Sequence, residues 1–286
     1  MAARPIPTTA ADVREFPFTD TDFERIRRMI HARAGISLNG TKRNMVYSRI
    51  ARQLRAHGFG SFPEFLDAAE QDPRMDEAFI NALTTNLTSF FRESHHFPLL
   101  AQYLASLPRR GTIELWCSAA STGEEPYSMA MTAIEAFDSP KPPVRIIATD
   151  VDTNVLATAR KGVYRGESVA QLASAQLKRH FLRGAGPHGG MVRVRPEVAA
   201  LVTFRPLNLL APRWDVKGPF AAIFCRNVMI YFDKPTQYTI LERFVPLLTT
   251  GGLLFAGHSE NFTRATGLFR LRGKTVYERI GTGMAP

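Results

Sequence analysis

Apolar positions in the first third of the chain recur every three or four residues, as at Phe23, Ile26, Met29 and Ile30. This spacing is typical of amphipathic helices, and the alternation expected of strands is missing there. Gly35 would end the first helix. The pattern predicts further helices over about 42–57, after Ser61 and over about 73–83. We therefore expect an all-α domain at 18–86, then a linker and connecting helix at 87–111.

From residue 112 onward, short apolar runs alternate with helical segments. The pattern predicts strands over 113–117, 144–148, 201–204, 220–225 and 252–256, and helices over 124–137, 153–160 and 236–248. The runs 269–271 and 276–280 predict a closing hairpin. Strands that alternate with helices indicate a parallel, doubly wound α/β sheet, here with an antiparallel ending, in a domain at 112–286.

One segment, 162–200, does not follow this alternation. It contains a short helical stretch at about 174–180, a glycine-rich loop at 184–190 and an alternating run at 191–195. An alternating run after such a loop is typical of a hairpin. We expect a small β-subdomain inserted into the α/β domain.

Composition and charge limit the cellular location and the classes of binding partner that we expect. Hydrophobic residues form 45% and charged residues 22% of the chain, which argues against a disordered or fibrous protein. No apolar run is long enough to span a membrane, no secretory signal is visible, and Cys117 and Cys225 form no CxxC pair, so we expect a cytoplasmic protein. The net charge is +10, and nine Lys or Arg with no acid lie between Arg25 and Pro63. This stretch could bind nucleic acid, anionic lipid or an acidic protein.

Acidic residues follow the first two predicted strands, at the end of the sheet where α/β proteins bind ligands. Glu124 and Glu125 come after the first strand. They suit a ligand with a positive group better than a phosphate, although they would also complement the dipole of the helix that begins there. Asp150 ends the second strand, where it could bond both hydroxyls of a ribose, and we expect Asp152 to cap the next helix.

The later strands add further candidates. Asn208 could pair with an adenine edge or could be a turn asparagine. Ribose, adenine and a positive amino-acid group describe S-adenosylmethionine better than NAD, whose GxGxxG fingerprint is missing. Tyr231 lies where an acceptor would meet the transferred group unless it is a core aromatic, and we interpret His258 as structural rather than as a base. No Ser/His/Asp set and no metal-ligand spacing stand out, so no metal is expected.

Four motifs make the chain similar to the chemotaxis receptor methyltransferases, the CheR family. They are Asn86-Leu87-Thr88 with Phe90-Phe91-Arg92-Glu93, and the runs 120–128, 224–232 and 255–262. The resemblance covers nearly the whole chain. It implies a Rossmann-like class I methyltransferase sheet, S-adenosylmethionine as cofactor, S-adenosylhomocysteine as product and glutamate side chains of chemoreceptors as substrate.

The same resemblance implies roles for individual residues. It implies cofactor contacts at Asn86, Thr88, Arg92, Glu125, Asp150, Asn208, Leu209, Arg226 and Asn227. It also implies that Arg92 and Tyr231 lie near the reacting carboxylate. A glutamate side chain, with a reference pKa of ~4.3, is already ionised at neutral pH, so such an enzyme needs alignment and exclusion of water rather than a base.

Other functions remain open on the residues alone. The basic domain could make this an RNA methyltransferase, although no aromatic residues interleave with its arginines to stack bases, and we expect no nucleic-acid partner. The protein could also be a non-catalytic sensor of S-adenosylmethionine or, least favoured, a nicotinamide-dependent enzyme. We expect a monomer that is recruited to membrane receptor clusters without inserting into the membrane.

A basic helix face is the first candidate surface for receptor docking. On a helix over 42–57, Arg49, Arg52 and Arg55 fall on one face and apolar side chains fall on the other. The pattern is often only a solvated face. Because the region has no acids, we expect these arginines to dock on the acidic methylation region of a helical receptor.

The inserted subdomain is the second candidate surface. Gly186 and Gly189 lie in its loop, and Arg193 and Arg195 would lie on one face of an exposed strand. Some members of the family bind a receptor's C-terminal pentapeptide, Asn-Trp-Glu-Thr-Phe, through this module. We therefore expect a peptide tether rather than a hairpin that only braces the sheet.

Overall fold

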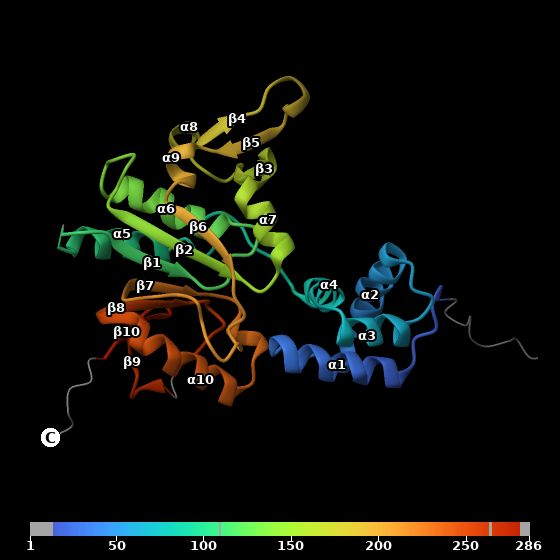
Figure 1. The fold of residues 1–286 in the computed structure, drawn as a ribbon. Coiled ribbons are helices and arrows are strands. Elements are labelled where there is room, and N and C mark those ends of the chain that lie inside the picture. The colour runs from blue at the N-terminus through green and yellow to red at the C-terminus, as the bar shows by residue number, and fades with distance from the viewer. Residues whose placement is uncertain (1–13, 109, 263–264, 281–286) are drawn as a thin grey trace, which may run out of the picture. The chain divides into compact units, whose positions relative to one another are not determined.

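The computed structural model describes residues 14–108, 110–262 and 265–280, and Figure 1 shows its elements. By their internal packing the residues separate into two units. Within these described ranges, one unit holds 14–32 and 38–83, and the other holds 33–37, 84–108, 110–262 and 265–280. Among the described residues, no helix combines the length and the apolar character that crossing a membrane requires.

Helices form the first unit, as predicted. They are α1 (Asp20–Ala34), α2 (Arg43–His57), α3 (Phe62–Gln71) and α4 (Pro73–Leu83), with a 3-10 turn, η1 (Gly40–Lys42), before α2. Gly35 follows α1 with a φ of +68°, a conformation that favours glycine at a helix end. Ile50 and Leu54 of α2 are fully buried, so this helix packs its predicted apolar face inward.

Acids from other segments balance part of the basic stretch. Arg25 of α1 lies 2.7 Å from Asp67 and 2.8 Å from Glu70, both on α3. Arg43 of α2 lies 2.8 Å from Asp20. The unpaired positive charge of this unit is therefore smaller than the sequence count suggests.

A seven-stranded sheet, in the order β6-β2-β1-β7-β8-β10-β9, forms the second unit. Its strands are β1 (Ile113–Cys117), β2 (Val144–Asp150), β6 (Val202–Pro206), β7 (Phe220–Cys225), β8 (Leu248–Ala256), β9 (Phe269–Gly273) and β10 (Val276–Arg279). β6, β2, β1, β7 and β8 pair in parallel, and β10 is antiparallel to β8 and β9. The α/β class and the antiparallel ending are confirmed. β8 begins at Leu248, earlier than the predicted start at residue 252. The predicted start is late because Gly251 and Gly252 interrupt the apolar pattern of the strand.

Helices cover both faces of this sheet (Figure 1). α5 (His96–Ser106), α6 (Glu124–Ala136) and α7 (Thr153–Lys161) pack on one face, and α10 (Lys234–Phe244) packs on the other. In β1, Leu115 and Cys117 pack toward the first group, whereas Trp116 packs against Phe244 of α10. A sheet buried on both faces leaves the carboxyl ends of its parallel strands as the place for a ligand.

The insertion forms a separate three-stranded antiparallel sheet, in the order β3-β5-β4. Its elements are β3 (Val163–Arg165), α8 (Ser174–His180), β4 (Phe181–Arg183), β5 (Met191–Val194) and α9 (Pro196–Ala199). The predicted β4–β5 hairpin is present. The third strand, β3, was missed because three residues are too few to show an alternating pattern.

Two details of the predicted tether are wrong. Arg195 lies outside β5 and does not share a strand face with Arg193, because Pro196 begins α9 and ends the strand. Its guanidinium donates instead to the Lys178 carbonyl, at 3.2 Å. In addition, β5 is the central strand, paired on both sides, so a peptide could add only to the outer edge of β3 or β4.

Candidate functional site

A pocket opens at the carboxyl ends of β1, β2, β6 and β7. Its lining comes from the segments that follow these strands, from the segment 84–88, from Arg92 before α5, and from Ala34 and Ile36. All ten residues expected near the cofactor or the acceptor line it: Asn86, Thr88, Arg92, Glu125, Asp150, Asn208, Leu209, Arg226, Asn227 and Tyr231. The fold thus gathers at one place the residues singled out along most of the sequence.

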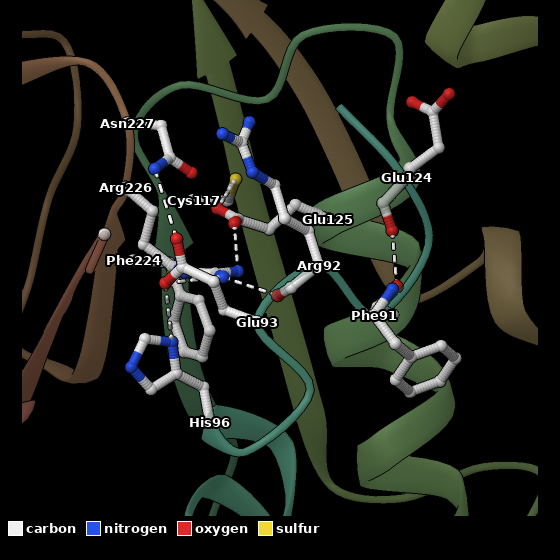
Figure 2. A network of polar contacts seen from close by, with 12 residues as sticks. Phe91, Arg92, Glu93, His96, Cys117, Glu124, Glu125, Phe224, Arg226 and Asn227 are labelled. Carbon is white, nitrogen blue, oxygen red and sulfur yellow. Dashed lines mark hydrogen bonds and ion pairs between the residues drawn. The ribbon is translucent and has the colours of Figure 1, made fainter. Parts of the chain in front are cut away.

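The two glutamates after β1 have different surroundings. Glu125 lines the pocket, and its carboxylate accepts hydrogen bonds from Arg226 Nη1 at 2.6 Å and from the Cys117 thiol at 3.3 Å. The Glu124 carboxylate instead accepts from the Thr122 hydroxyl at 2.6 Å and points away from this network in Figure 2. Burial raises the pKa of both carboxyls, and Arg226 opposes that shift at Glu125. Glu125 is therefore the acid that can meet a ligand here.

Asp150 presents a buried carboxylate at the end of β2. Its Oδ2 accepts from the Ser121 N–H at 2.8 Å, and its Oδ1 accepts from the Asp152 N–H at 3.0 Å. Burial raises the pKa of Asp150 to about 6. Asp152 accepts from the backbone N–H groups of Asn154 and Val155 at the start of α7, so the predicted cap is confirmed.

Two asparagines of the pocket have side chains engaged within the protein. Asn86 Nδ2 donates to Asp152 Oδ2 at 2.8 Å. Asn208 Nδ2 donates to the Arg33 carbonyl at 2.5 Å, and Asn208 Oδ1 accepts from the Leu210 N–H at 2.9 Å. The second bond is that of a turn asparagine, one of the two interpretations that the sequence left open. An adenine contact here would fall to backbone groups of Asn208 and Leu209.

Arg226 lies fully buried between two carboxylates, as Figure 2 shows. Its Nη1 is 2.6 Å from Glu125 and its Nη2 is 3.2 Å from Glu93. Nη2 also donates to the Arg92 carbonyl at 2.5 Å. The Arg92 side chain, half-buried, donates from Nη1 to the Leu87 carbonyl at 2.7 Å. Arg92 is thus held by two hydrogen bonds, one from Arg226 to its backbone carbonyl and one from its side chain to the Leu87 carbonyl.

Glu93 is the residue of this network to which the sequence assigned no role. Its Oε1 accepts from Asn227 Nδ2 at 3.2 Å and faces His258 Nδ1 at 2.9 Å. The His258 and Asn227 bonds and the Arg226 charge hold the pKa of Glu93 at about 2 despite its burial. Glu93, His95 and His96 place potential metal-ligating atoms within 4.8 Å of one another, but the Arg226 guanidinium beside Glu93 would repel a cation. The signal for Glu93 was the Phe90–Glu93 motif, in which only Arg92 received a role.

Several residues at this site have a left-handed backbone although they are not glycine. They are Phe91 (φ +53°), Glu93 (+53°), Ser121 (+48°) and Asn227 (+58°). Such a conformation costs roughly 1–2 kcal/mol in an L-residue and persists where the surroundings enforce it, often at functional sites. At Gly257, an added Cβ would lie 2.4 Å from Asn227 Nδ2, so the neighbouring loop leaves no space for a side chain.

The buried carboxylate of Glu260 stabilises the turn after β7. This carboxylate accepts hydrogen bonds from the backbone N–H groups of Asn227, Val228, Met229 and Gly257, at 2.5–3.0 Å. Tyr231 follows, half-buried, and lines the pocket instead of packing in the core. His258 is likewise no core residue, because its side chain is 71% exposed.

The predicted docking arginines of α2 differ in their surroundings. Arg49 donates to the carbonyls of Ala82 and Leu83 at the end of α4, at 3.4 Å and 3.2 Å, and so caps that helix. Arg55 lies 3.2 Å from Glu15, an acid that precedes the basic stretch. Arg52 is exposed. The basic face is therefore narrower than the helical spacing predicts.

Comparison with known proteins identifies the family. Residues 86–278 match the family described as CheR methyltransferase, SAM binding domain, and residues 21–84 match CheR methyltransferase, all-alpha domain. This chain belongs to the CheR methyltransferase family. The resemblance found in the sequence motifs is confirmed.

Three chemotaxis protein methyltransferases are similar to this chain over almost its whole length. The chain is 55% identical to the chemotaxis protein methyltransferase of Klebsiella aerogenes, over 96% of both chains. It is 54% identical to that of Escherichia coli, over 91% of both. It is 51% identical to chemotaxis protein methyltransferase 2 of Pseudomonas aeruginosa, over 95% of this chain and 97% of that one.

As a CheR methyltransferase, the protein is an enzyme that uses S-adenosylmethionine. The pocket fits this cofactor chemically. Glu125 offers a buried carboxylate for an ammonium group, and Asp150 offers another for ribose hydroxyls. Apolar side chains such as Ile36, Leu207 and Phe232 line the same pocket and suit an adenine ring.

Proposed function

We propose that this CheR enzyme transfers the methyl group of S-adenosylmethionine to glutamate side chains of chemoreceptors, forming glutamyl methyl esters and S-adenosylhomocysteine in chemotactic adaptation. The observation that carries the proposal is the presence of Arg92 and Tyr231 on the same pocket lining as Glu125 and Arg226. A guanidinium and a phenol beside the cofactor residues suit an incoming carboxylate.

The chemistry of the pocket favours a carboxylate acceptor over an amine. In the described part of the chain, the pocket lining contains no His, Lys or Cys, and Glu125 is engaged by Arg226. A glutamate acceptor, with a reference pKa of ~4.3, needs no base, whereas a lysine must first lose a proton. The bound cofactor supplies an electrophilic methyl group. The protein's residues then bind the acceptor, orient it and exclude water.

Labelled S-adenosylmethionine and receptor-containing membranes from the same organism test this proposal. We expect label on the receptor that is released as methanol by mild base, the behaviour of a methyl ester. Label on RNA instead would indicate a nucleic-acid methyltransferase. Cofactor binding without transfer to any substrate would indicate a sensor.

Receptor docking through the exposed part of the α2 face belongs to the same proposal. Arg52 and Arg55 offer positive charge to the acidic methylation region of a receptor's helical cytoplasmic part, while Arg49 supports the helix packing. The enzyme would act as a monomer, recruited to membrane receptor clusters from the cytoplasm without inserting into the membrane.

The inserted subdomain would tether the enzyme to a receptor's C-terminal pentapeptide. An extended peptide can add to an exposed strand, and the outer edges of β3 and β4 have no partner strand among the described residues. Arg193 is exposed and could pair with an acidic side chain or a terminal carboxylate. Such a tether raises the local concentration of enzyme around neighbouring receptors.

A further inference from the structure

Arg226 has two acidic neighbours, and only one of them belongs to the pocket. Glu125 lines the pocket, at 2.6 Å from Arg226, whereas Glu93 is not part of the lining and lies 3.2 Å from Arg226. The side chains of Glu125 and Glu93 are 9% and 10% exposed, and that of Arg226 is 0% exposed. In such a buried cluster each charge acts strongly on the next.

The charge balance of the pocket depends on Glu93. Arg92 and Arg226 carry two positive charges on the lining, and Glu125 and Asp150 carry two negative charges, which sum to zero. Glu93, ionised beside Arg226, brings the sum to −1. The cofactor carries an ammonium, a sulfonium and a carboxylate, and therefore a net charge of +1. Without Glu93, the Glu125 charge would be fully neutralised by Arg226 and would attract an ammonium only weakly.

We propose that Glu93 is an electrostatic positioning residue: it neutralises Arg226 from outside the pocket, so that Glu125 keeps its negative charge for the cofactor's amino group. The inference rests on the proposed contact between Glu125 and that group. Two further contacts fix Glu93 for this role. Its Oε1 accepts from Asn227 Nδ2 and faces His258 Nδ1, so its remaining oxygen, Oε2, faces Arg226.

Two ligands that differ by one charged group separate this role from a purely structural one. The first is S-adenosylhomocysteine, and the second is its deamino analogue, which lacks only the ammonium. Binding of both is measured by calorimetry at pH 7.5. In Glu93→Gln we expect S-adenosylhomocysteine to bind at least about tenfold more weakly, while the deamino analogue binds as it does to the wild type. Glu93→Asp, which keeps the charge, should retain most of the preference for the amino group.

A matched control removes a second buried carboxylate that contacts Asn227, without touching Arg226. Glu260→Gln alters the carboxylate that holds residues 227–229, so it should weaken both ligands by the same factor. Equal weakening of both ligands in Glu93→Gln would overturn the proposal and leave Glu93 structural. If Glu125→Gln also keeps the wild-type preference for the amino group, the assignment of Glu125 to that group is wrong instead.

A double variant tests the charge argument even if the single variant fails to fold. Glu93→Gln with Arg226→Gln removes both members of a buried ion pair, which proteins tolerate better than the loss of one member. Because Arg226 opposes the burial that raises the pKa of Glu125, the double variant is measured at pH 8.5 as well as at pH 7.5, so that Glu125 is ionised. With Arg226 neutral and Glu125 ionised, the preference for the amino group should return to within about threefold of the wild type. A double variant that binds both ligands equally at both pH values, while the wild type prefers the amino group, would refute the role of Glu93.

Discussion

The Asp150 carboxylate accepts a hydrogen bond of 2.8 Å from the backbone N–H of Ser121, which ties the end of β2 to the loop after β1. Ser121 adopts a left-handed backbone, with a φ of +48°, and the bond to Asp150 helps to hold it there. The same carboxylate lines the cofactor pocket. Asp150 therefore both shapes the pocket and faces its ligand.

Asp150→Ala should weaken S-adenosylhomocysteine binding by roughly 1–3 kcal/mol, the usual cost of losing charge-assisted hydrogen bonds. The affinity should also depend on pH. Burial raises the pKa of Asp150 to about 6, and ribose hydroxyls bond best to the ionised form. Wild-type affinity should therefore fall as the pH drops below 6, by up to about tenfold per pH unit.

Asp150→Asn is the control for this pH dependence, because it cannot titrate. Between pH 7.5 and pH 5 its affinity, measured by calorimetry, should fall less than that of the wild type. Any remaining fall would come from Glu125, whose pKa burial also raises. An Asp150→Asn protein with the wild-type pH profile would assign the dependence to another group.

Tyr231→Phe should lower the rate of receptor methylation about ten- to a hundredfold without abolishing it, because the phenol orients an acceptor that is already a nucleophile. The lower rate should appear in kcat more than in the KM for the cofactor. Single-turnover methyl transfer from pH 6.5 to 8.5 provides the measurement. A sharp dependence of that rate on one group with a pKa near 7 would contradict catalysis without a base.

The burial of His96 leads us to expect that the protein is less stable in acid. Its ring is fully buried, and its Nε2 lies 2.9 Å from the Lys274 carbonyl. Burial lowers the pKa of His96 to about 4 from 6.5, so the unfolded chain takes up the proton first. The free energy of unfolding should therefore fall progressively as the pH drops from 6.5 toward 4, by about 3 kcal/mol in all.

Urea unfolding of wild type and His96→Gln between pH 7 and pH 4.5 tests this expectation. The variant should lose the part of the slope that His96 causes. His188→Gln, at an exposed position in the β4–β5 loop, should leave the slope unchanged. Glu93 does not interfere, because its pKa of about 2 places its contribution at lower pH. A His96→Gln protein that loses stability as steeply as the wild type would assign the slope to other groups.

Periodicity predicted the elements of the fold, because long apolar patterns dominate local structure. It could not predict β3, or the position of β5 at the centre of its sheet, because pairing partners leave no mark on a short run. For the site, residue type and strand-end position led to Asp150 and Glu125. Neither could reveal Glu93, which acts only through contacts with residues far along the chain.

Side-chain partners also explain why the predicted docking face of α2 is narrower in the structure. Arg49 has the spacing of a surface arginine, but the end of α4 provides carbonyls within its reach. Arg55 seemed free of acids, but Glu15 approaches it from outside the stretch that was counted. Such contacts depend on tertiary packing, so they cannot be predicted from the sequence of one helix.

Arg52→Glu with Arg55→Glu should slow receptor methylation about tenfold or more at low salt and leave cofactor affinity unchanged. The wild-type rate should fall as salt rises, and the variant should lose most of that dependence. Arg28→Glu with Arg74→Glu reverses the same number of charges at exposed positions on α1 and α4, and should have a smaller effect. Normal methylation by the α2 variant at both low and physiological salt would remove the docking role.

Peptide binding at the inserted subdomain can be tested at a single backbone position of its edge strand, β4. The Gly184 N–H donates to the Met191 carbonyl, and the His180 carbonyl accepts from the Arg195 N–H. Because antiparallel strands alternate the direction of these groups, Leu182 pairs with Arg193 of β5 and the Arg183 N–H points outward. An added peptide strand would use that outward N–H, and Arg183→Pro would remove it while leaving the β4–β5 ladder intact.

Fluorescence polarisation with the pentapeptide Asn-Trp-Glu-Thr-Phe should therefore show micromolar-class binding to the wild type, roughly −8 kcal/mol at 1 μM, and none to Arg183→Pro. Bulky residues at Gly186 and Gly189 should also abolish binding, because Gly186 has a φ of +56° and a Cβ at Gly189 would lie 3.3 Å from the Gly186 carbonyl oxygen. Cofactor affinity should persist in every variant, since the loop lies outside the pocket lining. If Arg183→Pro binds the peptide normally, the added strand does not use the β4 edge, and the outer edge of β3 becomes the site to test. If the wild type binds no peptide even at millimolar concentration, the subdomain only braces the fold, and the enzyme must reach its receptor through the basic face of α2.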